Sequence, residues 1–100
     1  MIIVLTTYPE RKSANAAARK LVQGRLAACV NVVKIESSLF RWKGRLRIEK
    51  EYLLMIKARA RDYRKLESAI RSDHPYSLPE IIRLRVDGGL PDYIAWVEKG

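Results

Sequence analysis

His74, the only histidine of the chain, has the side chain best suited to metal chemistry. Asp73 precedes it directly, and Glu80 lies a few residues downstream. An imidazole beside carboxylates is a suitable ligand set for a borderline divalent cation. We therefore predict His74 and Asp73 as weak metal ligands, with further ligands supplied by a neighbouring copy of the chain. The structural alternative is a histidine that ends a helix, where its partial positive charge suits the helix dipole.

The remaining reactive residues give little sign of catalysis. A single cysteine, Cys29, lies within an apolar run, so we interpret it as a buried structural thiol. One Cys and one His cannot form a closed zinc site within one chain. The sequence also lacks a P-loop, a G-x-G-x-x-G motif, a nucleophile elbow and H-E-x-x-H. We therefore expect no enzyme activity and no required cofactor.

The elements that must position these residues fit one domain, residues 1–100, large enough for a core without disulfides. Apolar β-branched runs predict strands, and apolar residues at helical spacing predict helices. We expect a helix capped by Ser13 and ended by a left-handed Gly24, and a second helix capped by Asp62 and ended by Pro75. A third begins at Pro91, with Tyr93, Trp96 and Val97 pointing inward. The expected strands are Ile2–Tyr8, Ala27–Ile35, the hairpin within Leu39–Ala58, and Ile81–Val86.

The order of these elements is β-α-β-β-α-β-α. It predicts an α+β fold of the ferredoxin-like, split βαβ kind, with an antiparallel-rich sheet, helices on one face and an added C-terminal helix. An enzyme of the acylphosphatase kind would share this fold, but a fold alone is a poor basis for assigning an activity.

The hairpin is too long for a domain of this size. Trp42–Arg45 is the predicted turn, and the following strand would span roughly 40 Å at ~3.3 Å per residue. The domain itself should be only ~26 Å across, so part of the hairpin must project from it. A projecting strand edge invites aggregation unless it is paired. We therefore expect self-association in a closed ring, with Phe40, Trp42 and Tyr52 filling the joint between subunits.

The charge balance is strongly basic. There are 20 Lys and Arg against 11 Asp and Glu, a net charge of +9. Such a charge permits binding to nucleic acid or to an anionic membrane. Because the charges are spread along the chain, we expect a solvated basic surface and neither of those partners. The short apolar start resembles neither a signal peptide nor a membrane span, so a cytoplasmic location is expected.

Several stretches together resemble the CutA family of divalent-cation tolerance proteins. The matching pieces are Thr6-Thr7-x-Pro9, Arg25-Leu26-Ala27-Ala28-Cys29-Val30-Asn31, Trp42-x-Gly44, Glu51 ahead of Leu54 and Lys57, His74-Pro75-Tyr76-x-x-Pro79-Glu80-Ile81, and Tyr93-x-x-Trp96. The resemblance covers essentially the whole chain. It is the ordered set, rather than any one piece, that is specific.

The resemblance implies a cytoplasmic homotrimer joined by inter-subunit strand pairing, with a role in tolerance to copper and other divalent metals and no established catalysis. It also implies a likeness to PII signalling trimers, so a small-ligand regulatory protein is the alternative function. Some family members are attributed a copper-binding cysteine in the first strand and a His-His pair before Pro-Tyr. Here those positions hold Thr6 and Asp73-His74, so any metal site should be weaker and should favour oxygen ligands.

Overall fold

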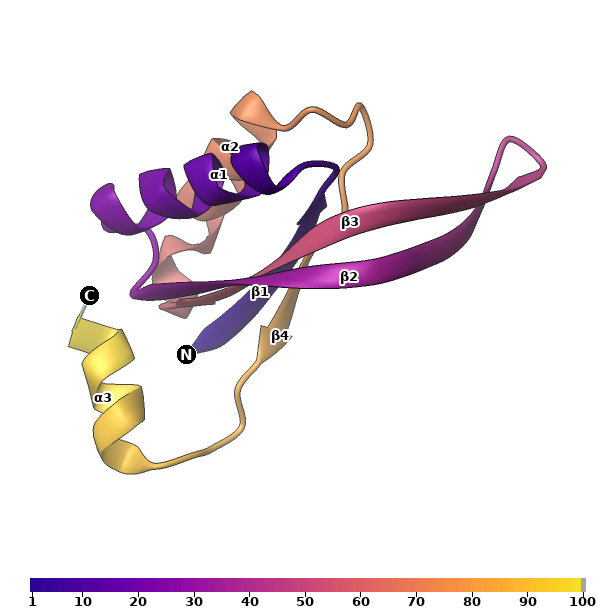
Figure 1. Cartoon of the computed structure of the whole chain (residues 1–100). Helices are drawn as coiled ribbons and strands as arrows, with labels where there is room; N and C mark the ends of the chain where they lie inside the picture. Colours follow the sequence, from indigo (N-terminus) through magenta and orange to yellow (C-terminus); the bar gives the residue numbers. More distant parts are fainter. Residues whose placement is uncertain (100) are drawn as a thin grey trace.

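The four strands form one sheet in the order β2-β3-β1-β4, and every neighbouring pair is antiparallel (Figure 1). A computed structural model describes residues 1–99. The elements follow the predicted order: β1 (Ile2–Tyr8), α1 (Arg11–Gln23), β2 (Cys29–Trp42), β3 (Arg45–Ala58), a short 3-10 turn η1 (Ala60–Asp62), α2 (Tyr63–Asp73), β4 (Ile81–Arg85) and α3 (Pro91–Lys99). Because β3 lies between β1 and β2, the first βαβ unit is split, and the predicted ferredoxin-like fold is confirmed.

Strands β2 and β3 form the projecting arm that their length predicts. Each has 14 residues, and the long axis of the molecule is 44 Å against 25 and 21 Å for the other two. The arm extends well beyond the helices in Figure 1. Lys43 and Gly44 join the two strands with φ angles of 52° and 78°. Two successive positive φ angles are typical of the type I′ turn, whose twist matches that of the flanking strands.

Strand β2 is longer than the sequence analysis predicted. It continues past Ile35 to Trp42, with a bulge in its pairing between Ile35 and Ser38. The polar run Glu36–Ser38 looks like the end of a strand, but the long antiparallel partner β3 keeps this segment extended. The bulge absorbs the irregularity without ending the strand.

The ends of α1 differ from the prediction. The helix begins at Arg11 after Glu10, so Ser13 is not its N-cap; the Ser13 hydroxyl instead donates to the Glu10 carbonyl at 3.0 Å. Gly24 follows the helix with a φ of −80°, and the left-handed residue is Arg25, with a φ of 59°. Gly24 is suited to its place for another reason, since a Cβ there would lie 3.0 Å from the Lys20 carbonyl oxygen. Asp62 precedes α2 as predicted, although its carboxylate accepts from Arg59 Nε at 2.8 Å and does not cap the helix.

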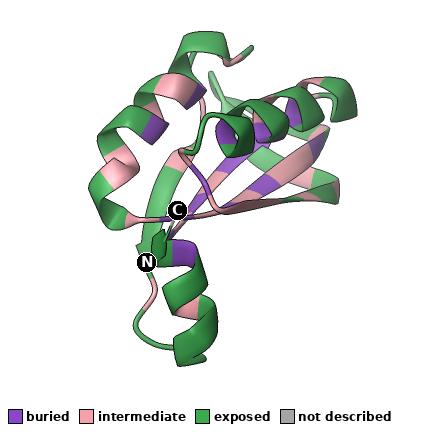
Figure 2. Ribbon diagram, turned by 90° about the vertical axis from the view of Figure 1, so that its left-hand side faces the viewer, coloured by how far each residue is buried: buried purple, intermediate pink, exposed green. Residues whose placement is uncertain are grey.

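Helices α1 and α2 cover one face of the sheet, and the core lies between these helices and the sheet (Figure 2). The core-facing side chains of β1 and β3 alternate with outward ones, as Val4, Leu54 and Ile56 are completely buried. Helix α1 contributes Ala14, Ala18 and Leu21, and α2 contributes Leu66 and Ile70. Helix α3 stands apart from this core. Only Val97 of its predicted inward residues is buried; Tyr93 is 39% exposed and Trp96 53%.

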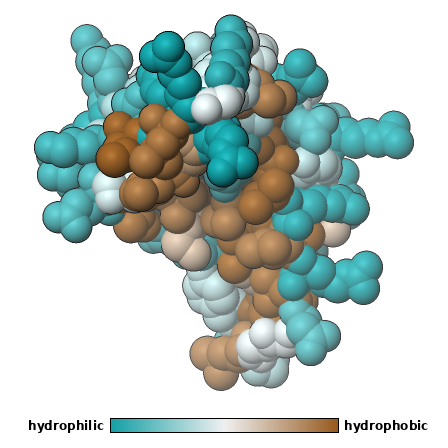
Figure 3. Space-filling model, turned by 90° about the vertical axis from the view of Figure 1, so that its right-hand side faces the viewer, coloured by the Kyte–Doolittle hydropathy of each residue, from teal (hydrophilic) through white to brown (hydrophobic). Residues whose placement is uncertain are grey.

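Neither α1 nor α2 covers the opposite face of the sheet. The strand registers place eight apolar side chains on it, which we call the open face: Ile3, Leu5, Val33, Ile35, Leu53, Met55, Ile82 and Leu84. The same registers place Thr7, Cys29, Asn31, Glu51 and Lys57 on this side of the sheet, beside the apolar set. Val33, Ile82 and Leu84 are each more than 40% exposed. Seen from the hairpin end, apolar side chains form a continuous surface bordered by polar ones (Figure 3). Monomeric proteins rarely expose an apolar patch of this kind.

Candidate functional site

The segment between α2 and β4 lies at the end of β1 that β4 leaves uncovered. Pairing between β1 and β4 reaches only Thr6 and Ile81, so Thr7 and Tyr8 have no partner strand on that side. The segment from His74 to Glu80 lies there instead. Its side chains reach Thr6 of β1 and Glu51 of β3, which brings three parts of the chain together.

His74 is fixed by contacts on both ring nitrogens. Its Nδ1 accepts from the Tyr76 backbone N–H at 3.2 Å, which places the proton of the neutral ring on Nε2. That nitrogen lies 3.2 Å from Thr6 Oγ1 and donates to it. The ring also stacks on Tyr8, with 4.3 Å between centroids. Burial lowers the pKa of His74 from its ordinary 6.5, so the imidazole is neutral at pH 7.

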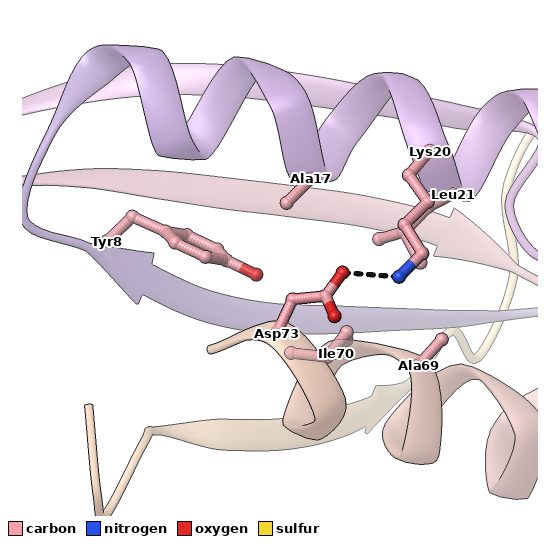
Figure 4. Close-up of a pocket in the computed structure, with 7 residues that line it drawn as sticks. All are labelled: Tyr8, Ala17, Lys20, Leu21, Ala69, Ile70 and Asp73. Carbon is pink, nitrogen blue, oxygen red and sulfur yellow. Dashed lines mark hydrogen bonds and ion pairs between the residues drawn. The ribbon is translucent and has the colours of Figure 1, made fainter. Parts of the chain in front are cut away.

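Asp73 is turned toward α1. Its carboxylate forms an ion pair with Lys20 and accepts from the Ser72 hydroxyl at 3.2 Å. Figure 4 shows the Lys20 pair across a small cavity lined by Tyr8 and by apolar residues of both helices. The hydrogen bond from Lys20 lowers the pKa of Asp73. Asp73 and His74 are thus neighbours in sequence with separate sets of partners, and the structure does not join them into one ligand set.

Tyr76 and Glu51 form a second contact, which the sequence analysis did not single out as a site. The Tyr76 hydroxyl donates to Glu51 Oε2 at 2.7 Å, and Glu51 is only 8% exposed. Burial, together with this hydrogen bond, raises the pKa of Tyr76 well above its usual range. The available signal was the position of Glu51, where the outward face of β3 changes from charged to apolar.

A groove of about 840 Å³ runs from this contact along the base of the arm. Its polar lining includes Glu49, Glu51, Tyr76 and Lys50, and Arg47 Nη2 pairs with Glu49 Oε1 at 2.9 Å. Phe40, Trp42, Leu39 and Leu78 supply apolar walls. An apolar groove with a few polar groups can hold either a small ligand or a segment of another chain.

The other predicted residues do not add a metal centre. Cys29 is half-buried at the start of β2, opposite Lys57 of β3, so the thiol that we predicted to be buried is only partly covered in the single chain. Within residues 1–99, no three His, Cys, Asp or Glu side chains gather closely enough to hold a metal ion. In the same range, no helix is both long and apolar enough to cross a membrane.

The split βαβ order and the antiparallel sheet define a class, the ferredoxin-like α+β proteins. Residues 2–100 match the family described as CutA1 divalent ion tolerance protein, and the chain belongs to that family. It is 37% identical over 97 residues to the divalent-cation tolerance protein CutA of Thermus thermophilus, covering 97% of this chain and 94% of that one.

Solved structures of CutA proteins have the same fold as this chain. A point mutant of CutA1 from Pyrococcus horikoshii superposes with a TM-score of 0.94 at 35% identity, covering 99% of this chain and 96% of that one. The PII-like protein CutA from Nostoc gives a TM-score of 0.91 at 36% identity, covering 97% and 93%. Some curated relatives are longer. The chain spans 60% of the CutA homolog of Xenopus laevis and 52% of CutA of mouse.

Proposed function

We propose that the chain is a non-catalytic protein of the divalent-metal response that works as a homotrimer. The observation that supports this most directly is the open face, eight apolar side chains across four strands with neither α1 nor α2 over them. Burying such a surface contributes about 25 cal/mol per Å² of apolar area. A second copy of the chain is the partner that is always available to cover it.

The arm supports the same proposal. In the sheet order β2-β3-β1-β4, no strand within residues 1–99 pairs with the outer edge of β2 along its 14 residues or with the outer edge of β4. Strand pairing between copies satisfies these edges, and cyclic closure keeps the assembly finite. The proposed number of copies is three, as the resemblance to CutA and PII proteins implies. Phe40 and Trp42, each about 40% exposed, would then lie in the joint.

We propose that His74 is a ligand of copper or another divalent cation, with Asp73 nearby. In the conformation described here both ring nitrogens of His74 are hydrogen-bonded and Asp73 is paired with Lys20. A metal would have to displace these partners, so the proposed affinity is weak.

Calorimetric titration with Cu(II) tests this ligand assignment. We expect His74→Ala to reduce the affinity and Asp73→Asn to reduce it less. Asp87→Asn, which removes the same charge elsewhere, serves as the control. Equal affinities for the wild type and His74→Ala would remove His74 as a ligand.

A PII-like regulatory trimer is the second candidate, favoured by the groove along the arm. In a trimer this groove would border a neighbouring subunit, and Arg47 and Lys50 could hold an anionic small molecule there. A thermal-shift screen of anionic metabolites tests this, because a ligand that binds only the folded state raises Tm. The candidate predicts a stabiliser that acts on the wild type and not on Arg47→Gln. Arg25→Gln is the charge-matched control, and a screen without any stabiliser counts against the candidate.

A cytoplasmic location remains part of the proposal. One structural relative, from Archaeoglobus fulgidus, is described as periplasmic. Fractionation of the native host with a compartment marker tests the location, and recovery in a periplasmic fraction would overturn it.

A further inference from the structure

The fold gathers the basic residues that are dispersed in the sequence. Segments 10–25 and 59–74, which contain α1 and α2, hold ten basic residues and four acidic ones, and so carry +6 of the chain's net +9. The two helices lie side by side over the core, joined by the Lys20–Asp73 pair. Basic residues that are scattered along the sequence are therefore concentrated in one layer of the folded chain.

Two of the four acidic side chains of this layer form ion pairs within it, and a third accepts a hydrogen bond. Asp62 pairs with Arg59, Asp73 with Lys20, and Glu67 accepts from the Tyr63 hydroxyl at 2.7 Å. The remaining cations are exposed and have no salt-bridge partner within residues 1–99. One of the eight, Arg11, lies over the Tyr52 ring at 5.6 Å from its centroid. We call the other seven the basic face: Lys12, Arg19, Arg25, Arg61, Arg64, Lys65 and Arg71.

The basic face has a regular layout. Lys12 and Arg19 lie seven residues apart on α1, away from its buried stripe, and Arg64 and Arg71 lie seven residues apart on α2. Seven residues are two helical turns, about 10.5 Å along each axis. Two adjacent helices thus present two rows of cations toward solvent, and Figure 2 shows the outer surfaces of these helices as exposed. Arg83 of β4, above the Tyr63 ring at 4.8 Å, extends the basic surface beyond α2.

We propose that the basic face binds the phosphate backbone of double-stranded nucleic acid without sequence specificity. Most of its cations are Arg, whose planar guanidinium matches phosphate oxygens in pairs. The one Phe, Trp or Tyr of segments 10–25 and 59–74, Tyr63, is half-buried and lies under Arg83, so no free ring is offered to unpaired bases and a duplex fits better than a single strand. A membrane surface fits less well, because interfacial helices insert large apolar residues and the only large exposed one on α1 is Val22.

This inference is independent of the proposed assembly. The basic face and the open face lie on opposite sides of the sheet, so covering one leaves the other free. Monomers and trimers would both bind, and a trimer would present the surface three times.

Fluorescence anisotropy with a labelled mixed-sequence DNA duplex, and with an RNA duplex, tests the proposal. If four to six phosphates are neutralised, log Kobs should fall against log [salt] with a slope of about −4 to −5. The decisive variant is Arg19→Gln with Arg64→Gln and Arg71→Gln, since Gln supports a helix about as well as Arg. We expect at least tenfold weaker binding and a slope smaller by about 2 to 3.

The charge-matched control is Arg41→Gln with Lys43→Gln and Arg45→Gln, at the exposed tip of the arm. The proposal predicts less than about a twofold change in affinity for it. Equal losses in both triple variants would show an effect of net charge alone and overturn the proposal, as would absence of duplex binding at low salt. Preferential binding to anionic phosphatidylserine vesicles, or equal competition by polyglutamate, would also overturn it. Should the first triple variant fail to fold, its three single substitutions must each reduce the slope by about 1.

Discussion

The Tyr76 hydroxyl donates a 2.7 Å hydrogen bond to Glu51 Oε2 and thereby ties the segment after α2 to the middle of the long strand β3. The contact lies where the compact part of the molecule ends and the arm begins. Together with the two bonds of His74 it holds the 74–80 segment against the uncovered end of β1.

Replacement of Tyr76 by Phe should destabilise the protein by about 1–3 kcal/mol, because it leaves the buried Glu51 carboxylate without its donor. Urea unfolding at one fixed protein concentration measures this free energy. Tyr93→Phe, on an exposed residue of α3, removes a hydroxyl without such a partner and should change stability by less than about 0.5 kcal/mol. Equal effects of the two changes would contradict the role given to the Glu51 contact.

Acidification should weaken the fold through His74. Its pKa is lowered in the folded state, so the unfolded chain binds the proton more readily below pH 6.5. The contribution of His74 is fully present above pH 6.5 and is lost as the pH falls from there toward the lowered folded pKa. Protonation also removes the Nδ1 acceptor that Tyr76 uses. Unfolding free energies measured from about pH 5 to pH 8 should fall on the acid side, and His74→Asn should flatten this dependence. An unchanged profile in His74→Asn would assign the titration to another group.

Truncation of Leu54 to Ala should cost about 2–5 kcal/mol, because this completely buried side chain lies in the centre of β3 beneath the helices. Chemical denaturation measures the loss. Val22→Ala, on a side chain that is 41% exposed, is the matched control and should cost much less. Comparable losses would mean that the core is not centred where the structure places it.

A charge on the open face should separate the subunits without unfolding them. Ile82 is 47% exposed in the single chain, so Ile82→Glu leaves the core intact while placing a carboxylate in the proposed interface. Sedimentation should show monomers that retain the circular dichroism of the wild type. Ser68→Glu, on an exposed position of α2, should leave the assembly unchanged. An assembly that tolerates Ile82→Glu would contradict the use of this face.

The order of the elements could be predicted because each boundary has a local cause. Pro9 and Pro75 stop their elements, and the type I′ turn follows from the glycine at position 44. The end of β2 was harder to predict, since the polar Glu36–Ser38 run remains extended only through its pairing with β3. Trp96 has a helical spacing typical of a core residue, yet the single chain offers little for it to contact.

The site was predictable only in part. His74 could be identified from its sequence neighbours, and the alternative of a helix-ending histidine matches its position as the residue after α2, where its N–H bonds to the Arg71 carbonyl. Its partner Thr6 lies 68 residues away, and Glu51 lies 25 residues from Tyr76. Such contacts depend on the strand register, which local patterns do not determine. Separation of Asp73 from His74 likewise follows from the position of Lys20 on another helix.

The solution mass at nanomolar concentration, measured by mass photometry of a tagged chain or by fluorescence-detected sedimentation, tests the central claim most directly. One chain has a mass of 11.5 kDa, and we expect a single species of three times that value, exclusive of any tag, that persists on dilution. A monomer with an intact fold would contradict the account, because the open face and the arm would then be exposed without a partner.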